Sequence, residues 1–83
     1  MKQRTKSNLK LRKVLAHNLR AYREREHLSQ EKLAEMSDLH RTYIGSVERA
    51  ERNVTLSTLS ALAQALDISV PQLLTPGIFD DEA

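Results

Sequence analysis

Residues 30–49 hold two short helical patterns separated by residues 37–40, and this pairing constrains the fold more than any other feature of the chain. Two helices joined by so short a turn must cross steeply, so a small residue is needed where they meet. Ala34 in the first helix meets this need, and Ile44 and Val47 of the second helix are expected to pack against it. The polar side of the second helix, which starts with Arg41, then faces outward.

The composition favours one small all-α domain. A chain of 83 residues is long enough for a single modest core, and two glycines, two prolines and few β-branched runs argue against a sheet. The absence of cysteine excludes disulfides and thiolate metal sites. No stretch is typical of a signal peptide or a membrane span, so we expect a cytoplasmic protein without a membrane partner.

The charges are unevenly distributed along the chain. All thirteen Lys and Arg lie in residues 1–52, together with seven acidic residues. Residues 53–83 contain four acidic residues and no Lys or Arg. Because the two crossing helices lie in the basic part, this distribution suits a polyanionic partner.

The helical periodicity predicts five helices, at about residues 11–26, 30–36, 41–49, 56–66 and 70–74. The expected N-terminal caps of the second, fourth and fifth helices are Ser29, Thr55 and Ser69. The predicted buried stripes of the first and fourth helices are Leu11, Leu15, Leu19 and Tyr22, and Leu56, Leu59, Leu62, Ala63 and Leu66.

Four motifs have the residue types and spacing of a known family. They are Leu19-Arg20-x-x-Arg23, Leu28-Ser29-Gln30, Leu33-Ala34 and Ile44-x-x-Val47-Glu48-Arg49. Over residues 15–75 the chain resembles the XRE (Cro/C1-like) family of helix-turn-helix transcriptional regulators. The resemblance implies a five-helix, lambda-repressor-like domain and a structural ion pair between Arg23 and Glu48. The turn glycine usual in that family falls at Asp38, a residue type that tolerates a left-handed backbone.

A longer string resembles a narrower group. Arg41-Thr42-Tyr43-Ile44, followed by Val47-Glu48-Arg49-x-x-Arg52-Asn53-Val54-Thr55, is similar to the controller proteins of restriction–modification systems, which are small dimeric regulators. The same string also occurs in many stand-alone XRE regulators, so both assignments remain open.

The resemblance makes residues 41–49 the recognition helix, and its exposed side chains become candidate DNA contacts. Arg41 offers a planar fork that fits guanine, and the methyl group of Thr42 can pack on thymine. Ser46 lies one turn further along, and Gln30 can hold a phosphate at the start of the preceding helix. The remaining candidates, mostly for phosphates, are Tyr43, Arg49, Arg52 and Asn53. The alternative for Arg41, Thr42 and Ser46 is a solvated helix surface, and for Tyr43 a packing residue.

The two chain ends are predicted to lie outside the domain of residues 11–76. Residues 1–10 are basic and almost free of apolar side chains, so we expect a flexible arm that is either a solubilising tail or an additional DNA contact. Residues 77–83 form an acidic tail. The apolar residues after the fourth helix exceed what a small core needs, which predicts a homodimer interface. Its members are Ile68, Val70, Leu73, Leu74, Ile78 and Phe79.

No residue pattern indicates an enzyme, a metal site or a cofactor. His17, His27 and His40 lack ligand spacing. We therefore expect a homodimeric, sequence-specific regulator on operator DNA that competes with or recruits RNA polymerase. The alternative is an antitoxin-like module whose acidic tail binds a partner protein.

Overall fold

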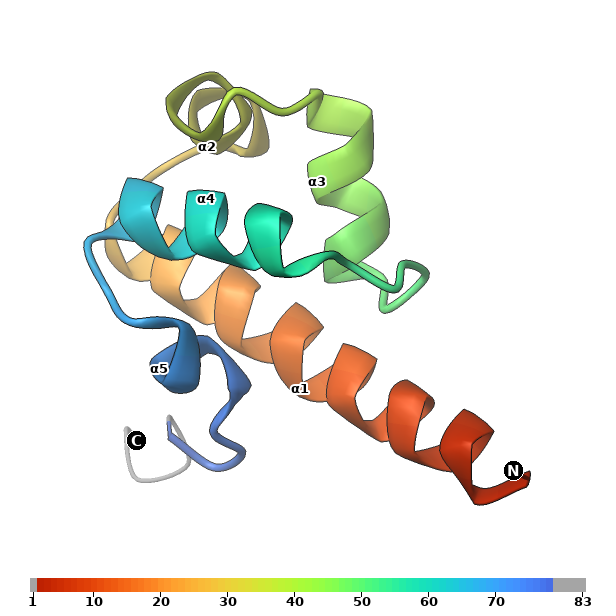
Figure 1. Ribbon diagram of the computed structural model, residues 1–83. Helices are drawn as coiled ribbons and strands as arrows, with labels where there is room; N and C mark the ends of the chain where they lie inside the picture. The colour runs from red at the N-terminus through yellow and green to blue at the C-terminus, as the bar shows by residue number, and fades with distance from the viewer. Residues whose placement is uncertain (1, 79–83) are drawn as a thin grey trace.

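The computed structural model describes the backbone of residues 2–78 and the side chains of residues 8–78. The helices are α1 (Lys2–Arg25), α2 (Gln30–Ser37), α3 (Arg41–Glu48), α4 (Leu56–Leu66) and α5 (Val70–Leu74). Between residues 2 and 78 no strand is present, so the predicted five-helix, all-α fold is confirmed. In Figure 1, α1 runs diagonally along the domain, α4 lies across it, and α2 and α3 lie together at one end. Within the described part of the chain, no helix has both the length and the apolar character needed to cross a membrane.

Three predicted helix starts, those of α2, α4 and α5, are confirmed by their capping hydrogen bonds. Ser29 accepts a hydrogen bond from the backbone N–H of Lys32, and the side chain of Thr55 likewise caps α4. At α5, Ser69 and Gln72 form a reciprocal capping box, which is an efficient start for so short a helix. Local side chains therefore define where these three helices begin.

Two aspartates terminate helices in the left-handed backbone conformation. Asp38 ends α2 with φ 59° and ψ 41°, and Asp67 ends α4 with φ 56° and ψ 44°. After Asp38, the N–H of Leu39 donates to the carbonyl of Ala34 at 2.9 Å, which turns the chain toward α3. Asp38 thus provides the turn that a glycine more often provides.

Helix α1 begins earlier than the sequence pattern predicts. It starts at Lys2, so the predicted start at Leu11 is wrong and the expected arm is largely helical. Residues 2–10 contain neither glycine nor proline and are rich in Lys, Arg, Gln and Leu, which form helices well. A segment of this kind continues a helix that already exists without needing a core of its own.

The core forms where all five helices meet. It contains Leu15, Leu19, Tyr22, Leu33, Ala34, Ile44, Val47, Leu59, Leu62, Ala63, Leu66 and Leu73. Ala34 of α2, the small residue expected at the crossing, is 4% exposed and belongs to this core. These contacts hold α2 and α3 in a fixed relative orientation.

Two leucines that the periodicity assigns to buried stripes are exposed. Leu11 is 51% exposed and belongs to the N-terminal half of α1, which extends beyond the other helices (Figure 1). Leu56 is 81% exposed because it is the first residue of α4, and the buried stripe begins one turn later at Leu59. Both predictions are wrong for the same reason, which is that a helical stripe is buried only where another element covers it.

The residues predicted for a dimer interface fall into three groups. Leu73 is fully buried inside the domain, so its assignment to the interface is wrong. Partly buried against the core are Ile68, Val70, Leu74 and Ile78. Phe79 and the acidic residues that follow it lie outside the described residues.

Helix α5 is attached to α1 by a buried amide that the sequence analysis does not identify. Asn18 is 1% exposed, and its Nδ2 donates to the carbonyls of Leu73 and Thr75 at 2.9 Å each. These carbonyls lie at the C-terminal end of α5 and need donors from outside that helix. A signal was present, since Asn18 is a polar residue on the same face of α1 as Leu15 and Tyr22.

Candidate nucleic-acid interface

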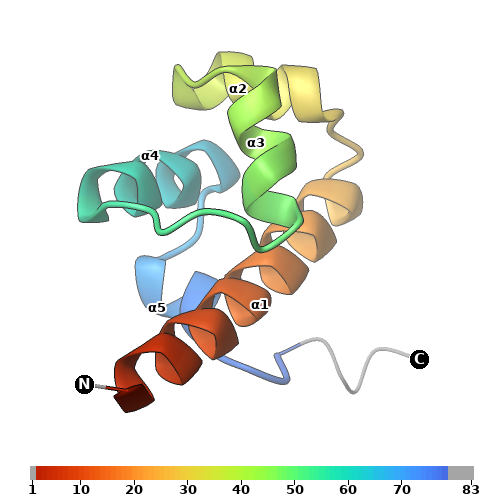
Figure 2. The same cartoon turned by 90° about the vertical axis from the view of Figure 1, so that its right-hand side faces the viewer.

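The start of α3 presents two of the predicted contact residues to solvent. Arg41 and Thr42 are both exposed, while Ile44 and Val47 on the opposite side of the helix are buried. The buried pair anchors the helix, so the exposed pair projects from a rigid support. Figure 2, which faces α3, shows this helix standing at the front of the domain.

At its C-terminal end, the same face of α3 is covered by a side chain from the connector between α3 and α4. Arg52 donates from Nε to Ser46 Oγ at 3.0 Å, and Ser46 in turn donates to the carbonyl of Tyr43 at 2.7 Å. The guanidinium carbon of Arg52 lies 5.4 Å from the centre of the Tyr43 ring, a cation–π distance. Because Nε is occupied, the two terminal nitrogens of Arg52 remain to face a ligand.

This arrangement corrects the prediction for Ser46. A direct DNA contact requires an accessible hydroxyl, but Ser46 is only 4% exposed. The helical spacing places it correctly on the face of Thr42, yet Arg52 lies over it. The chain therefore uses Ser46 to position Arg52.

The other predicted contacts surround this face. Asn53 is exposed next to Arg52. Arg49 is also exposed and donates from Nε to Glu51 Oε2 at 3.2 Å, a surface ion pair of little energetic weight. Tyr43 is half-buried, so it both packs on the domain and supports Arg52.

Gln30 lies at the first position of α2 but is partly engaged within the protein. Its Nε2 donates to Glu48 Oε1 at 3.0 Å, and the side chain is half-buried. The predicted phosphate contact would therefore have to use the rest of the amide or the backbone N–H groups of the helix start.

Glu48 is the centre of the polar network behind α3. Its side chain is 1% exposed, and Arg23 donates to it from Nε at 2.7 Å and from Nη2 at 3.0 Å. Arg23 also donates from Nη1 to the carbonyl of Leu28 at 2.8 Å. The structure thus contains the ion pair that the family resemblance implies, and it links α1 and the α1–α2 turn to the end of α3.

The hydrogen bond to Glu48 raises the pKa of Arg23 above its ordinary value, and nearby carboxylates act in the same direction against the effect of burial. A raised pKa means that the stabilisation is complete below the ordinary pKa of arginine and is lost only above it. Arg23 therefore stays charged at every pH at which the domain would be studied.

Gly45 makes room for two of these side chains. A Cβ atom at this position would lie 3.1 Å from Arg49 Nη1 and 3.7 Å from Gln30 Oε1. The atoms that approach Gly45 closely belong to flexible side chains. The backbone conformation at this position does not itself require glycine.

The chemistry of the surface is that of a binding site. Among residues 8–78, no group of three or more His, Asp or Glu side chains could hold a metal ion. The α3 face instead offers guanidinium, hydroxyl and amide groups on one rigid helix and its following connector, which is the arrangement that reads bases and phosphates in the major groove. The fold and this surface define a helix-turn-helix DNA-binding protein.

Comparisons with known proteins agree with this class. A family profile described as Helix-turn-helix matches residues 19–73. The Control protein C.SmaI of Serratia marcescens is 68% identical over 65 residues, which cover 78% of this chain and 77% of that protein.

Two crystal structures show the same fold with substantial sequence identity. The hypothetical transcription factor NHTF from Neisseria has a TM-score of 0.78 and 45% identity, covering 81% of this chain and 77% of that one. The restriction-modification controller protein C.AhdI from Aeromonas hydrophila has a TM-score of 0.73 and 45% identity, and the match covers 75% of this chain and 94% of that one. The chain belongs to the helix-turn-helix family of transcriptional regulators.

Proposed function

We propose that the chain is a controller protein that binds operator DNA as a homodimer, with α3 in the major groove of each half-site. The observation that carries the proposal is the exposed face of α3, where Arg41 and Thr42 project from one end and Ser46 and Tyr43 hold Arg52 at the other. The similarity to proteins named as control proteins supports the regulatory assignment. Occupying a promoter, such a dimer would compete with or recruit RNA polymerase.

The antitoxin-like alternative has less support from the described residues. It relies on apolar side chains near the acidic tail, of which Ile78 is half-buried against the core. A gel shift on DNA from upstream of the gene separates the two proposals, because an operator-binding regulator shifts that DNA without any partner protein.

Arg41→Ala is expected to weaken operator binding by about 1–3 kcal/mol and to relax the base preference at one position per half-site. The reason is that Arg41 lies exposed at the start of α3, where a guanidinium fork can pair with a guanine edge. Competition titrations with operators mutated at single positions measure both effects. An equal loss on operator and random DNA would instead make Arg41 a phosphate contact.

Ser46→Ala is expected to weaken operator binding by about 0.5–1.5 kcal/mol, because Arg52 loses the hydrogen bond that fixes its guanidinium. Fluorescence anisotropy with labelled operator provides the measurement. Ser60→Ala, an equivalent change at an exposed position of α4, is the control and should bind as the wild type does. Wild-type affinity in the Ser46 variant would show that Arg52 does not depend on this support.

A further inference from the structure

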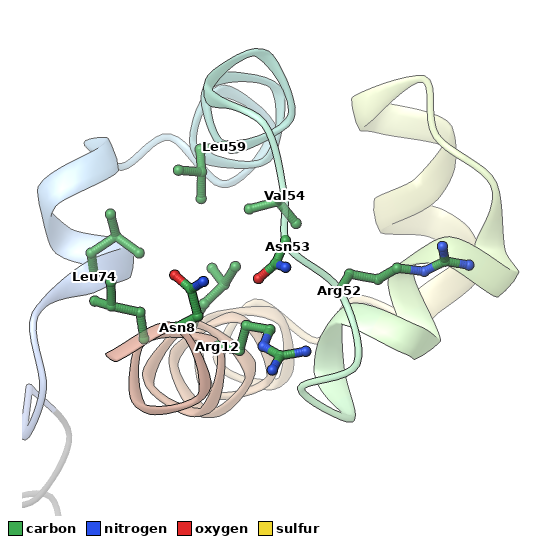
Figure 3. Close-up of a pocket in the computed structure, with 9 residues that line it drawn as sticks. Asn8, Arg12, Arg52, Asn53, Val54, Leu59 and Leu74 are labelled. Atoms are coloured by element: carbon green, nitrogen blue, oxygen red, sulfur yellow. The ribbon is translucent and has the colours of Figure 1, made fainter. Parts of the chain in front are cut away.

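A hollow of about 390 Å³ lies between the N-terminal half of α1 and the connector that follows α3. Its wall toward the core is apolar and includes Leu15 and Leu59. Asn8 and Arg12 from α1 and Asn53 from the connector supply its polar groups, and Arg52 also lines it while its guanidinium points away toward α3 (Figure 3). Two candidate DNA contacts therefore share one surface hollow with an arginine of α1 that the sequence analysis did not select.

Arg12 has an unusual environment. Its Nε is buried, and no acceptor for it is present among the described residues. A guanidinium group is charged at any accessible pH, so a buried N–H on it without an acceptor is costly. The residue as a whole is only half-buried, so part of its side chain is accessible to a ligand from solvent. The group that satisfies it best is an anion with more than one oxygen.

The position of Arg12 on the domain indicates which anion this is. Both ribbon views place the N-terminal half of α1 and the connector on the side of the domain where α3 is exposed (Figures 1 and 2). In Figure 3 the guanidinium of Arg12 points toward the connector. A duplex that occupies α3 and contacts Arg52 and Asn53 would therefore bring its backbone close to Arg12.

We propose that Arg12 binds a DNA backbone phosphate next to the connector, with Asn8 and Asn53 as neighbouring donors. The proposal rests on the proposed operator binding and extends it, because it assigns a DNA contact to α1, outside the helix-turn-helix. The helical extension of α1 contributes Asn8, which lines the same hollow one turn before Arg12. A contact of this kind adds affinity but carries no base preference.

Salt titration tests the proposal, because each phosphate contact contributes about 0.9 to the slope of log affinity against log salt concentration. Arg12→Gln removes one such contact from each subunit of the dimer, so it should make the slope shallower by about two and weaken operator and random DNA by the same factor. Lys10→Gln is the matched control, since it removes one charge from the opposite flank of α1, where Lys10 lines a different hollow with His17 and Pro76. The control should keep the wild-type slope.

The outcomes separate this inference from the function on which it rests. Wild-type protein that fails to bind any DNA contradicts the proposed function itself. If the wild type binds and Arg12→Gln keeps its slope, the Arg12 contact is absent, and a lowered melting temperature in that variant would then make Arg12 purely structural. Equal shallowing in both variants would indicate a general charge effect and overturn the assignment to Arg12.

Free phosphate is the other source of the same chemistry. Melting temperatures in phosphate and in chloride at equal ionic strength test it directly. Suppose that the melting temperature is higher in phosphate than in chloride, that Arg12→Gln abolishes this difference, and that the salt slope for DNA is unchanged in the variant. The hollow would then bind a free anion, and the DNA contact would be overturned. We expect the melting temperature to be the same in phosphate and in chloride, and the salt slope for DNA to be shallower in Arg12→Gln.

Discussion

Glu48→Ala is expected to lower the free energy of unfolding by about 3–5 kcal/mol, because it leaves the charge of Arg23 largely buried without its partner. The side chains of Arg23 and Glu48 are only 12% and 1% exposed, and the carboxylate accepts two hydrogen bonds from the guanidinium and one from Gln30. The total free energy of unfolding of a small domain is typically about 5–15 kcal/mol, so this loss is a large part of its stability. Urea denaturation followed by circular dichroism gives the value.

The control for this change is Glu35→Ala. Glu35 pairs with Lys32 at 3.0 Å, but the two side chains are 73% and 55% exposed. An ion pair in that environment contributes about 0–1 kcal/mol, so the control should unfold almost as the wild type does. Equal stability of the Glu48 and Glu35 variants would contradict the structural importance of the buried pair.

Val70→Asp is expected to give a folded monomer with operator affinity reduced roughly 100-fold or more, because two linked half-site contacts bind far more tightly than one. Val70 is half-buried in the protomer and is the first residue of α5, where the helix N-terminus tolerates a carboxylate. The protomer should therefore still fold, whereas a carboxylate in an apolar interface should prevent dimerisation. Sedimentation at tens of micromolar, roughly the range in which a weak dimer still forms, measures the assembly, and a gel shift measures the affinity.

Leu56→Asp is the matched control for the interface. Leu56 is also the first residue of its helix, but it is 81% exposed and lies outside the predicted interface. We expect this variant to remain a dimer. Monomers from Leu56→Asp together with dimers from Val70→Asp would move the interface to the start of α4, and a monomeric wild type would refute dimerisation altogether.

The features that the sequence predicts well are those that local chemistry determines. Ser29, Thr55 and Ser69 cap their helices through side chains that lie within three residues of the groups they bind. Asp38 adopts the left-handed conformation because a short polar side chain allows it. The Arg23–Glu48 pair is different, since the residues are distant in sequence and only the family resemblance implies their contact.

The features that the sequence does not predict depend on how helices and connectors pack over one another in the folded domain. Helical spacing places Ser46 beside Thr42, but it contains no information on the return of Arg52 from the connector to cover it. In the same way, the spacing of Leu56 and Leu73 cannot indicate that one lies before the covered part of α4 and the other inside the core. Periodicity identifies a helical face, and packing determines whether that face is buried.

A footprint on the DNA upstream of the gene tests the central claim most directly. The wild-type protein is predicted to protect two related half-sites centred about 34 Å apart, or a multiple of this spacing, on one side of the duplex. Arg41→Ala should weaken protection of both half-sites together. Binding to this DNA without a discrete footprint, or with no preference over random sequence, would contradict the account of α3 as a sequence-reading helix.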